Sequence, residues 1–122
     1  MKNETILIVE DDKDLNRLFS KYMAIAGFTC LSVTSVSDAL RVLLNTKPAV
    51  MVLDLGLEDG AGNAILDYLQ TKGNTETRVI VVSGRAFTSK DNLGPYQVDQ
   101  ILMKPVSPRA LSSLARSMIA IA

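Results

Sequence analysis

Five short apolar runs, separated by longer mixed stretches, organise the pattern of hydrophobic and polar positions along the chain. They cover residues 6–9, 29–33, 50–53, 79–82 and 101–103. Within the runs, apolar side chains follow one another with little polar alternation, which is typical of strands covered on both faces of a parallel sheet. We therefore predict five parallel strands.

The stretches between the first three runs have helical spacing. Apolar residues between positions 15 and 25 recur with a period near 3.6 residues, and Gly27 is placed to end that helix. A second helix is predicted around residues 39–44, with Ser37 as its N-cap and Pro48 beyond its end. Each of these helices would connect one strand to the next.

Two more helices are predicted later in the chain. Apolar residues at positions 65, 66 and 69 mark one helix, which ends near Gly73. The last helix covers about residues 108–118, with Ser107 as its cap and Pro108 at its first position. Both helices have an apolar face to cover the sheet.

The segment after the fourth run, GRAFTSKDNLGPYQVDQ, is a weaker helix candidate. It contains Gly94 and Pro95, and proline disfavours helix both at its own position and at the residue before it. We expect only a short or irregular helix there, over about residues 88–93.

Strands and helices alternate along the whole chain, and this order indicates the fold. Five strand–helix repeats predict an α/β fold with one parallel sheet and right-handed crossovers. Helices on both faces favour the doubly wound strand order 2-1-3-4-5. The chain has 122 residues without a linker or low-complexity tract, so residues 1–122 are predicted to form a single domain.

The composition removes several classes of function. The 13 basic and 13 acidic side chains give a net charge of zero, which offers no basic surface for nucleic acid or anionic membrane. The absence of His removes the usual zinc, haem and triad chemistries. No apolar run approaches ~18 residues, and the N-terminus lacks a secretory pattern, so we expect a cytoplasmic protein with no membrane partner.

Polar residues follow four of the five strands. They are Glu10, Asp11 and Asp12 after the first, Asp54 after the third, Ser83 after the fourth and Lys104 after the fifth. In this fold such residues gather at one edge of the sheet, where strand order reverses. Carboxylates without His or Cys suit Mg²⁺ or Mn²⁺, and a cation, an ammonium and a hydroxyl together suit a phosphoryl group. Asp54 could then be an oxygen nucleophile.

The same segments give the sequence a resemblance to the receiver domain of two-component response regulators, over essentially its whole length. The matching pieces are ILIVEDD, VLDLGLEDGAG around Asp54, VIVVSG, and LMKP, which contains Lys104. Each piece alone is a weak signal, but all occur in order at spacings that fit five strand–helix units. The resemblance implies the flavodoxin-like receiver fold.

The resemblance also implies roles at the phosphorylation site. Asp54 would be the phosphoacceptor, Ser83 the switch hydroxyl and Lys104 the partner of the phosphate. Pro105 would form a cis peptide bond with Lys104. The phosphodonor would be a phosphohistidine on a sensor histidine kinase or a phosphotransfer protein, and a small phosphodonor such as acetyl phosphate could also serve. A downstream output domain or protein would read the signal.

The metal site implied by the resemblance uses Asp11, Asp12 and Asp54, with the backbone carbonyl of Gly56 as a further ligand. The cation would be Mg²⁺ or Mn²⁺. Glu10 is expected to be a neighbour of this site rather than a ligand. The domain would act as a phosphorylation switch that catalyses only its own phosphorylation and dephosphorylation, and not as an enzyme with a separate substrate.

Two positions depart from the family pattern, and a third has an expected role of its own. Glu58 replaces a proline that often lies four residues after the phosphoacceptor, and Ile101 replaces the usual aromatic switch residue. Arg85, two residues after Ser83, is expected to tune the lifetime of the phosphate. The irregular fourth helix would weaken the usual dimer face, so any homodimer is expected to be weak.

Three alternatives remain from sequence. A receiver that no longer takes phosphate could act as a docking module. An aspartate-nucleophile phosphatase would want an acid two residues after Asp54, where Gly56 stands. A flavin carrier would need an uncharged phosphate-binding loop after the first strand, where this chain is acidic.

Overall fold

The computed structural model describes residues 4–56, 62–84 and 96–119. Its five strands form one parallel sheet in the order β2-β1-β3-β4-β5. The strands are β1 (Thr5–Val9), β2 (Thr29–Val33), β3 (Val50–Asp54), β4 (Arg78–Ser83) and β5 (Gln100–Met103). The predicted strand order is confirmed, and each strand lies within one residue of its predicted bounds.

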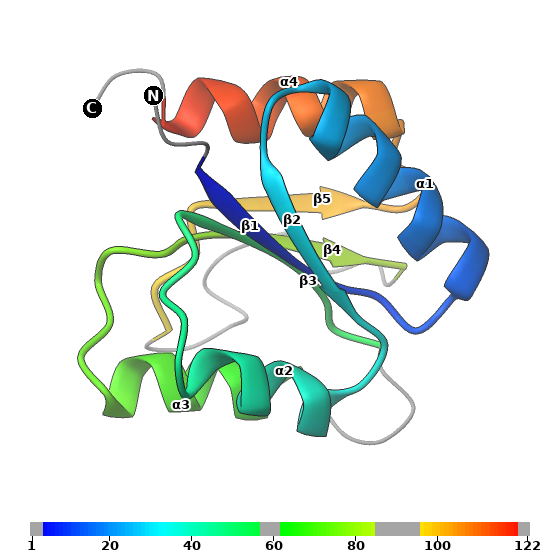
Figure 1. Cartoon of the computed structure of the whole chain (residues 1–122). Coiled ribbons are helices and arrows are strands. Elements are labelled where there is room, and N and C mark those ends of the chain that lie inside the picture. The colour runs from blue at the N-terminus through cyan, green and yellow to red at the C-terminus, as the bar shows by residue number, and fades with distance from the viewer. Residues whose placement is uncertain (1–3, 57–61, 85–95, 120–122) are drawn as a thin grey trace.

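Four helices in the described part of the chain cover the two faces of the sheet. They are α1 (Lys13–Ile25), α2 (Val36–Leu43), α3 (Asn63–Thr71) and α4 (Pro108–Ile119). The pair α1 and α4 lies over one face, and the pair α2 and α3 lies over the other (Figure 1). The irregular helix predicted over residues 88–93 falls outside the described residues.

The sheet separates two hydrophobic cores, and β1 contributes to both. Ile6 and Ile8 are fully buried with Phe19 of α1 and Leu111 of α4. Their neighbours Leu7 and Val9 are fully buried in the core beneath α2 and α3. A strand buried on both faces has no position left for a polar side chain, which explains its unbroken apolar run.

Two predicted helix ends are confirmed, and one predicted cap is wrong. Gly27 follows α1 with a φ of 98°, a value that favours glycine, and Ser107 Oγ accepts a hydrogen bond from the Ala110 amide. Helix α2, however, is capped by Ser35, whose Oγ accepts from the Asp38 amide at 3.1 Å, and not by Ser37. The helix starts earlier than predicted because Val36 is buried in the core.

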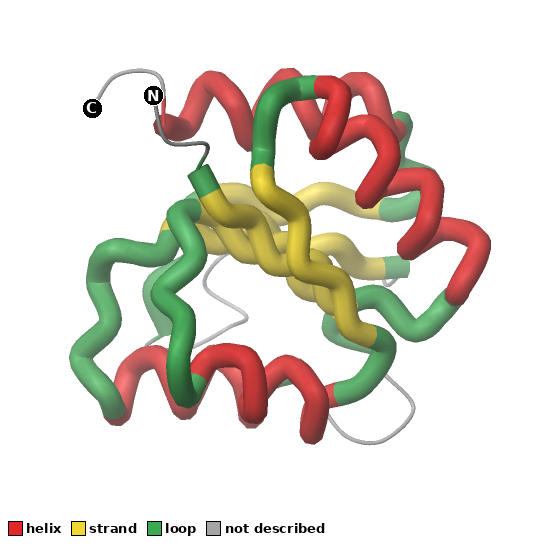
Figure 2. Tube along the Cα trace, viewed as in Figure 1, coloured by secondary structure: helices red, strands yellow, loops and turns green. Residues whose placement is uncertain are grey.

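The strands lie together between the two layers of helices (Figure 2). All neighbouring strands pair in parallel, so their carboxyl ends form a single edge. The strand order reverses between β1 and β3, and a ligand site is expected at the carboxyl end of that pair. Nowhere in the described ranges is there a helix long and apolar enough to cross a membrane.

Candidate functional site

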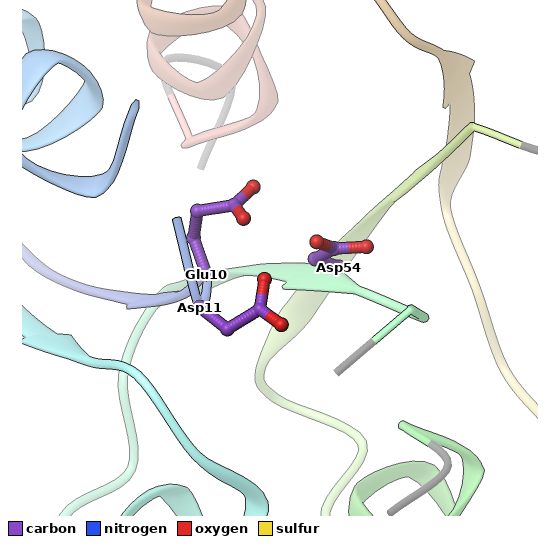
Figure 3. Close-up of side chains that lie close together, drawn as sticks. All are labelled: Glu10, Asp11 and Asp54. Atoms are coloured by element: carbon purple, nitrogen blue, oxygen red, sulfur yellow. The ribbon is translucent and has the colours of Figure 1, made fainter. Parts of the chain in front are cut away.

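Three carboxylates meet at the carboxyl edge of the sheet. One oxygen each of Glu10, Asp11 and Asp54 lies within 4.8 Å of the others. Their side chains point toward one another from the ends of β1 and β3 (Figure 3). Glu10 is only 1% exposed and Asp54 only 4%, whereas Asp11 is half-buried.

The register of the sheet brings these residues together. β1 and β3 are hydrogen-bonded neighbours, with Val9 opposite Leu53. Glu10 follows Val9 directly and Asp54 follows Leu53, so the two acids leave adjacent strands at the same level. The packing of the two cores fixes this level, because a shift of one residue would move each side chain of β1 from one core into the other.

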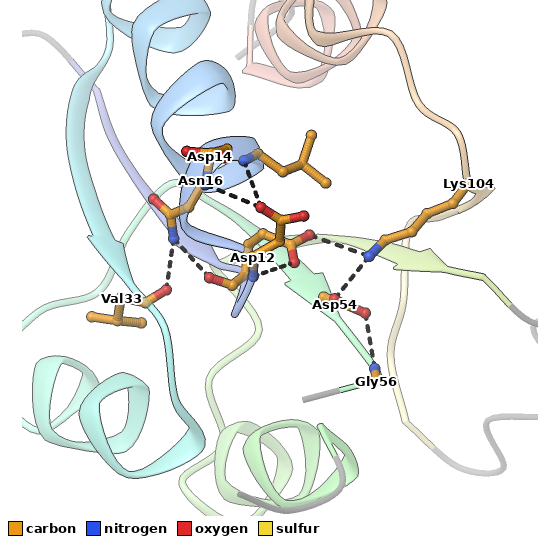
Figure 4. A network of polar contacts seen from close by, with 9 residues as sticks. Asp12, Asp14, Asn16, Val33, Asp54, Gly56 and Lys104 are labelled. Carbon is orange, nitrogen blue, oxygen red and sulfur yellow. Dashed lines mark hydrogen bonds and ion pairs between the residues drawn. The ribbon is translucent and has the colours of Figure 1, made fainter. Parts of the chain in front are cut away.

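Lys104 supplies the positive charge at the site. Its Nζ lies 3.0 Å from Asp54 Oδ2 and 3.4 Å from Glu10 Oε1 (Figure 4). Its backbone amide donates to the Ser83 carbonyl, which extends the pairing of β5 with β4. Burial lowers the pKa of the ammonium, but the hydrogen bond and charge of Asp54, together with Glu10, raise that pKa overall. The Lys104–Pro105 peptide bond is cis, as predicted.

The carboxyl of Glu10 has a raised pKa. Burial, and after it the charge and hydrogen bonding of Asp54, raise its pKa from 4.5 to about 7, against the opposing effects of the Asp12 amide and Lys104. Its Oε2 accepts a hydrogen bond from the Asp12 amide, but the buried Oε1 has no hydrogen-bond partner. That oxygen lies at ion-pair distance from Lys104 without hydrogen-bond geometry.

Asp12 has a different position from its neighbours. Its exposed carboxylate is the N-cap of α1, and its Oδ1 accepts from the amides of Asp14 at 3.0 Å and Leu15 at 3.1 Å. It is not among the three acids whose oxygens converge. The ligand role predicted for Asp12 stays a prediction, and the structure places Glu10 nearer to the other acids.

Ser83 and Gly56 border the site. Ser83 is the last residue of β4, between β3 and β5, and is 3% exposed. The Gly56 amide donates to Asp54 Oδ1 at 2.8 Å and so fixes one oxygen of that carboxylate. The roles expected for the Ser83 hydroxyl and the Gly56 carbonyl remain predictions. Glu58 and Arg85 lie outside the described residues.

The donors at this edge fit a small divalent cation. Carboxylate oxygens are the ligands that hard cations such as Mg²⁺ prefer, and no softer ligand stands among the three converging acids. Among the described residues, one ammonium faces three carboxylates, so Lys104 by itself does not balance their negative charge. The buried Glu10 Oε1, which lacks a hydrogen bond, is an oxygen that a cation would satisfy.

The sequence placed Glu10 beside the cation site, and the structure brings its carboxylate among the converging acids. The signal that could have shown this position is the helix start: an N-cap at Asp12 followed by acidic Asp14 in the first turn places the helix boundary at that residue. The acids that remain between strand and helix are then Glu10 and Asp11.

A doubly wound parallel sheet that presents an acidic cluster and a lysine at its switch point defines the receiver class of α/β proteins. The sequence profile described as "Response regulator receiver domain" matches residues 6–116. The chain belongs to this family. That assignment confirms the resemblance found in the sequence, and the family is one of signalling domains and not of classical enzymes.

Individual relatives agree with the family. The chain is 32% identical over 108 residues to the transcriptional regulatory protein CssR of Bacillus subtilis, covering 88% of this chain and 47% of that protein. It is 25% identical to GltR of Pseudomonas aeruginosa, covering 94% of this chain and 48% of that protein. The chain thus spans about half the length of these curated relatives.

A solved structure shows the same architecture. The CheY-like response regulator receiver domain of Methylobacillus flagellatus superposes with a TM-score of 0.79 at 25% identity, covering 96% of this chain and 99% of that one. These comparisons do not favour the alternatives considered from sequence, a docking-only receiver and an aspartate-nucleophile phosphatase.

Proposed function

We propose that this domain is a phosphorylation switch in which Asp54 accepts a phosphoryl group with the help of a divalent cation, Mg²⁺ or Mn²⁺. The observation that carries the proposal is the convergence of Glu10, Asp11 and Asp54 within 4.8 Å, with Lys104 at 3.0 Å from Asp54. The buried carboxylate at the switch point is thereby surrounded by groups that suit a phosphoryl group. The family assignment supports the same reaction.

In the proposed transfer, a carboxylate oxygen of Asp54 attacks phosphorus. The new P–O bond forms as the P–N bond of a phosphohistidine, or the P–O bond of acetyl phosphate, breaks, and the leaving group takes the electron pair. When bound, the cation neutralises charge on the phosphoryl oxygens. Lys104 can then pair with a phosphoryl oxygen, because its present partner Asp54 Oδ2 loses negative charge.

The cation would be held chiefly by Glu10, Asp11 and Asp54. The Gly56 carbonyl remains a candidate ligand, as predicted from the family. Asp12 would lie outside this set, because its carboxylate already caps α1. This ligand set is still made of three carboxylates, with Glu10 in place of Asp12.

The proposed output is a change in the surface near Ser83 and β5. Ser83 would turn its hydroxyl toward the phosphoryl group, and Lys104 is hydrogen-bonded to the same residue through the backbone. Ile101, on β5, is partly buried against the core beneath α2 and α3, so it would move by repacking and not by an aromatic flip. Phosphorylation would shift the population between two such arrangements.

The expected partners follow from this function. A sensor histidine kinase or phosphotransfer protein would supply the phosphoryl group, and an output domain or protein would read the switched surface. We further propose that the chain works as a single domain, that it acts in the cytoplasm, and that any homodimer is weak. As a switch, it would catalyse only its own phosphorylation and dephosphorylation.

Mass spectrometry of the intact protein tests the proposal. With acetyl phosphate and Mg²⁺, the protein is expected to gain one phosphoryl group, and the variant Asp54→Asn is expected to gain none. Asp14→Asn is the matched control, because it removes an aspartate whose side chain is 95% exposed. This control should be phosphorylated like the unchanged protein.

Two results would contradict the proposal. One is an unchanged mass in the presence of acetyl phosphate and Mg²⁺, and the other is full phosphorylation of Asp54→Asn. Steady hydrolysis of a simple phosphate ester would instead favour the alternative that the protein is an aspartate-nucleophile phosphatase.

A further inference from the structure

Asn16 is a polar residue in an apolar row. The buried residues of α1 are Asn16, Phe19 and Met23, spaced so that they face the sheet together. Asn16 is only 6% exposed. A buried amide is costly unless it is hydrogen-bonded, so its presence in this row requires specific partners.

The Asn16 side-chain nitrogen has two partners, and both are backbone carbonyls at the carboxyl edge of the sheet. Asn16 Nδ2 donates to the Val33 carbonyl at 2.8 Å and to the Glu10 carbonyl at 3.0 Å (Figure 4). Val33 is the last residue of β2, and its carbonyl also accepts from the Glu10 amide at 3.1 Å. The one side chain therefore links α1 to the ends of two strands.

The Glu10 carbonyl belongs to the peptide group that joins Glu10 to Asp11. Rotation of this group would change the backbone angles on both of its sides, and with them the directions of two of the three converging carboxylates. We propose that Asn16 is a positioning residue for the cation site, which holds this peptide group so that Glu10 and Asp11 stay aimed at Asp54.

Repulsion between the carboxylates explains why the site needs a residue such as Asn16. Three carboxylates whose oxygens lie within 4.8 Å repel one another, and a mobile turn after β1 would let two of them move apart. Asn16 opposes that motion through uncharged hydrogen bonds, so it adds no positive charge that would compete with a cation. The turn that carries Glu10 and Asp11 is then ordered during folding, so cation binding does not have to bear the entropy cost of ordering it.

This inference rests on the proposed function, because it concerns the same cation site. Its test is the dissociation constant for Mg²⁺, measured by an NMR titration of the whole domain. The unfolding temperature of each variant is measured in EDTA as well. Asn16→Leu keeps the approximate volume and removes both donors. Met23→Val is the matched control, because Met23 is fully buried on the same helix, seven residues after Asn16.

Asn16→Leu is expected to raise the dissociation constant for Mg²⁺ by about tenfold or more. Met23→Val should leave that constant within a factor of two. This should hold even if Met23→Val lowers the unfolding temperature as much as Asn16→Leu does. If Asn16→Leu does not fold, Asn16→Ala is expected to show the same loss of affinity.

The contrary outcomes are distinct. An unchanged Mg²⁺ affinity in a folded Asn16 variant, or an equal loss in Met23→Val, would overturn the role of Asn16 and leave the cation site standing. A parent protein that does not bind Mg²⁺ would overturn the cation site itself, and the role of Asn16 with it.

Discussion

At the scale of single residues, Glu10 shows how burial sets the properties of the site. Its pKa is raised to about 7 because the carboxyl is buried and Asp54 lies beside it. The folded protein therefore holds this proton more tightly than the unfolded chain, whose carboxyl titrates near 4.5. The resulting contribution to stability is complete below pH 4.5 and is lost as the pH rises through about 7.

This shift predicts how stability changes with pH in the metal-free protein. The free energy of unfolding in EDTA should fall between pH 5 and pH 8, with a contribution from Glu10 on the order of 2 kcal/mol. Glu10→Gln, which cannot ionise, should remove most of that contribution. Urea unfolding at each pH measures it, with Glu4→Gln as the control because Glu4 is exposed. Parallel pH profiles for the parent protein and Glu10→Gln would contradict the assignment.

The residue scale is also where sequence reasoning was least complete. The residue types pointed to an acidic site with a lysine, and the structure brings Asp11, Asp54 and Lys104 together. Which of three consecutive acids turns inward depends on where the helix starts, and the apolar pattern does not locate a helix start to one residue. The role of Asn16 could not be predicted, because its side-chain nitrogen bonds to backbone carbonyls, one of them at the end of β2, and the sequence pattern does not show such contacts.

At the scale of elements, the start of α1 divides the acidic stretch into two functions. Asp12 caps the helix, while Glu10 and Asp11 face the site. An N-cap carboxylate accepts hydrogen bonds from amides that the helix itself leaves unpaired, and it faces the positive end of the helix dipole. Asp12 therefore contributes to the stability of α1.

Two substitutions at Asp12 separate capping from metal binding. Asp12→Ala should lower the free energy of unfolding by about 1 kcal/mol, whereas Asp12→Ser keeps a capping oxygen and most of the stability. Both should bind Mg²⁺ far better than Asp11→Ala. Chemical unfolding and Mg²⁺ titration measure the two effects. If Asp12→Ser loses as much Mg²⁺ affinity as Asp11→Ala, then Asp12 is a ligand, as first predicted from sequence.

Elements were predictable where burial dictates the pattern. All five strands followed from apolar runs. The central strands β1, β3 and β4 are buried on both faces and tolerate little else. The edge strands β2 and β5 are only partly buried, and the apolar residues that they retain were enough to find them. The start of α2 was placed too late, at Ser37, because serines at positions 35 and 37 are equally good caps on paper. Burial of Val36 decides between them, and that contact belongs to the tertiary structure.

At the scale of the whole molecule, the site gathers charges that oppose folding. Glu10, Asp11 and Asp54 come from the ends of β1 and β3, so folding is what forces them together. Lys104 offsets part of this repulsion from the end of β5. A cation that binds only the folded state should therefore stabilise the entire domain.

Calorimetry can measure this coupling. At an Mg²⁺ concentration ten times the dissociation constant, the linkage relation gives about 1.4 kcal/mol of added stability. A domain of this size should then unfold at a temperature higher by roughly 5 °C. NaCl at the same ionic strength is the control, since screening alone should produce a smaller shift. Equal shifts with the two salts would argue against a specific cation site.

The distance along the chain between Asp54 and Lys104 has a consequence for synthesis. The two residues are 50 positions apart, and Lys104 follows the last strand to join the sheet, at its edge beside β4. A ribosome-bound chain would release β1 and β3 with their acids well before β5 emerges. During that interval the nascent protein holds the acids without the charge of Lys104, so the site is complete only after the last strand has joined the sheet.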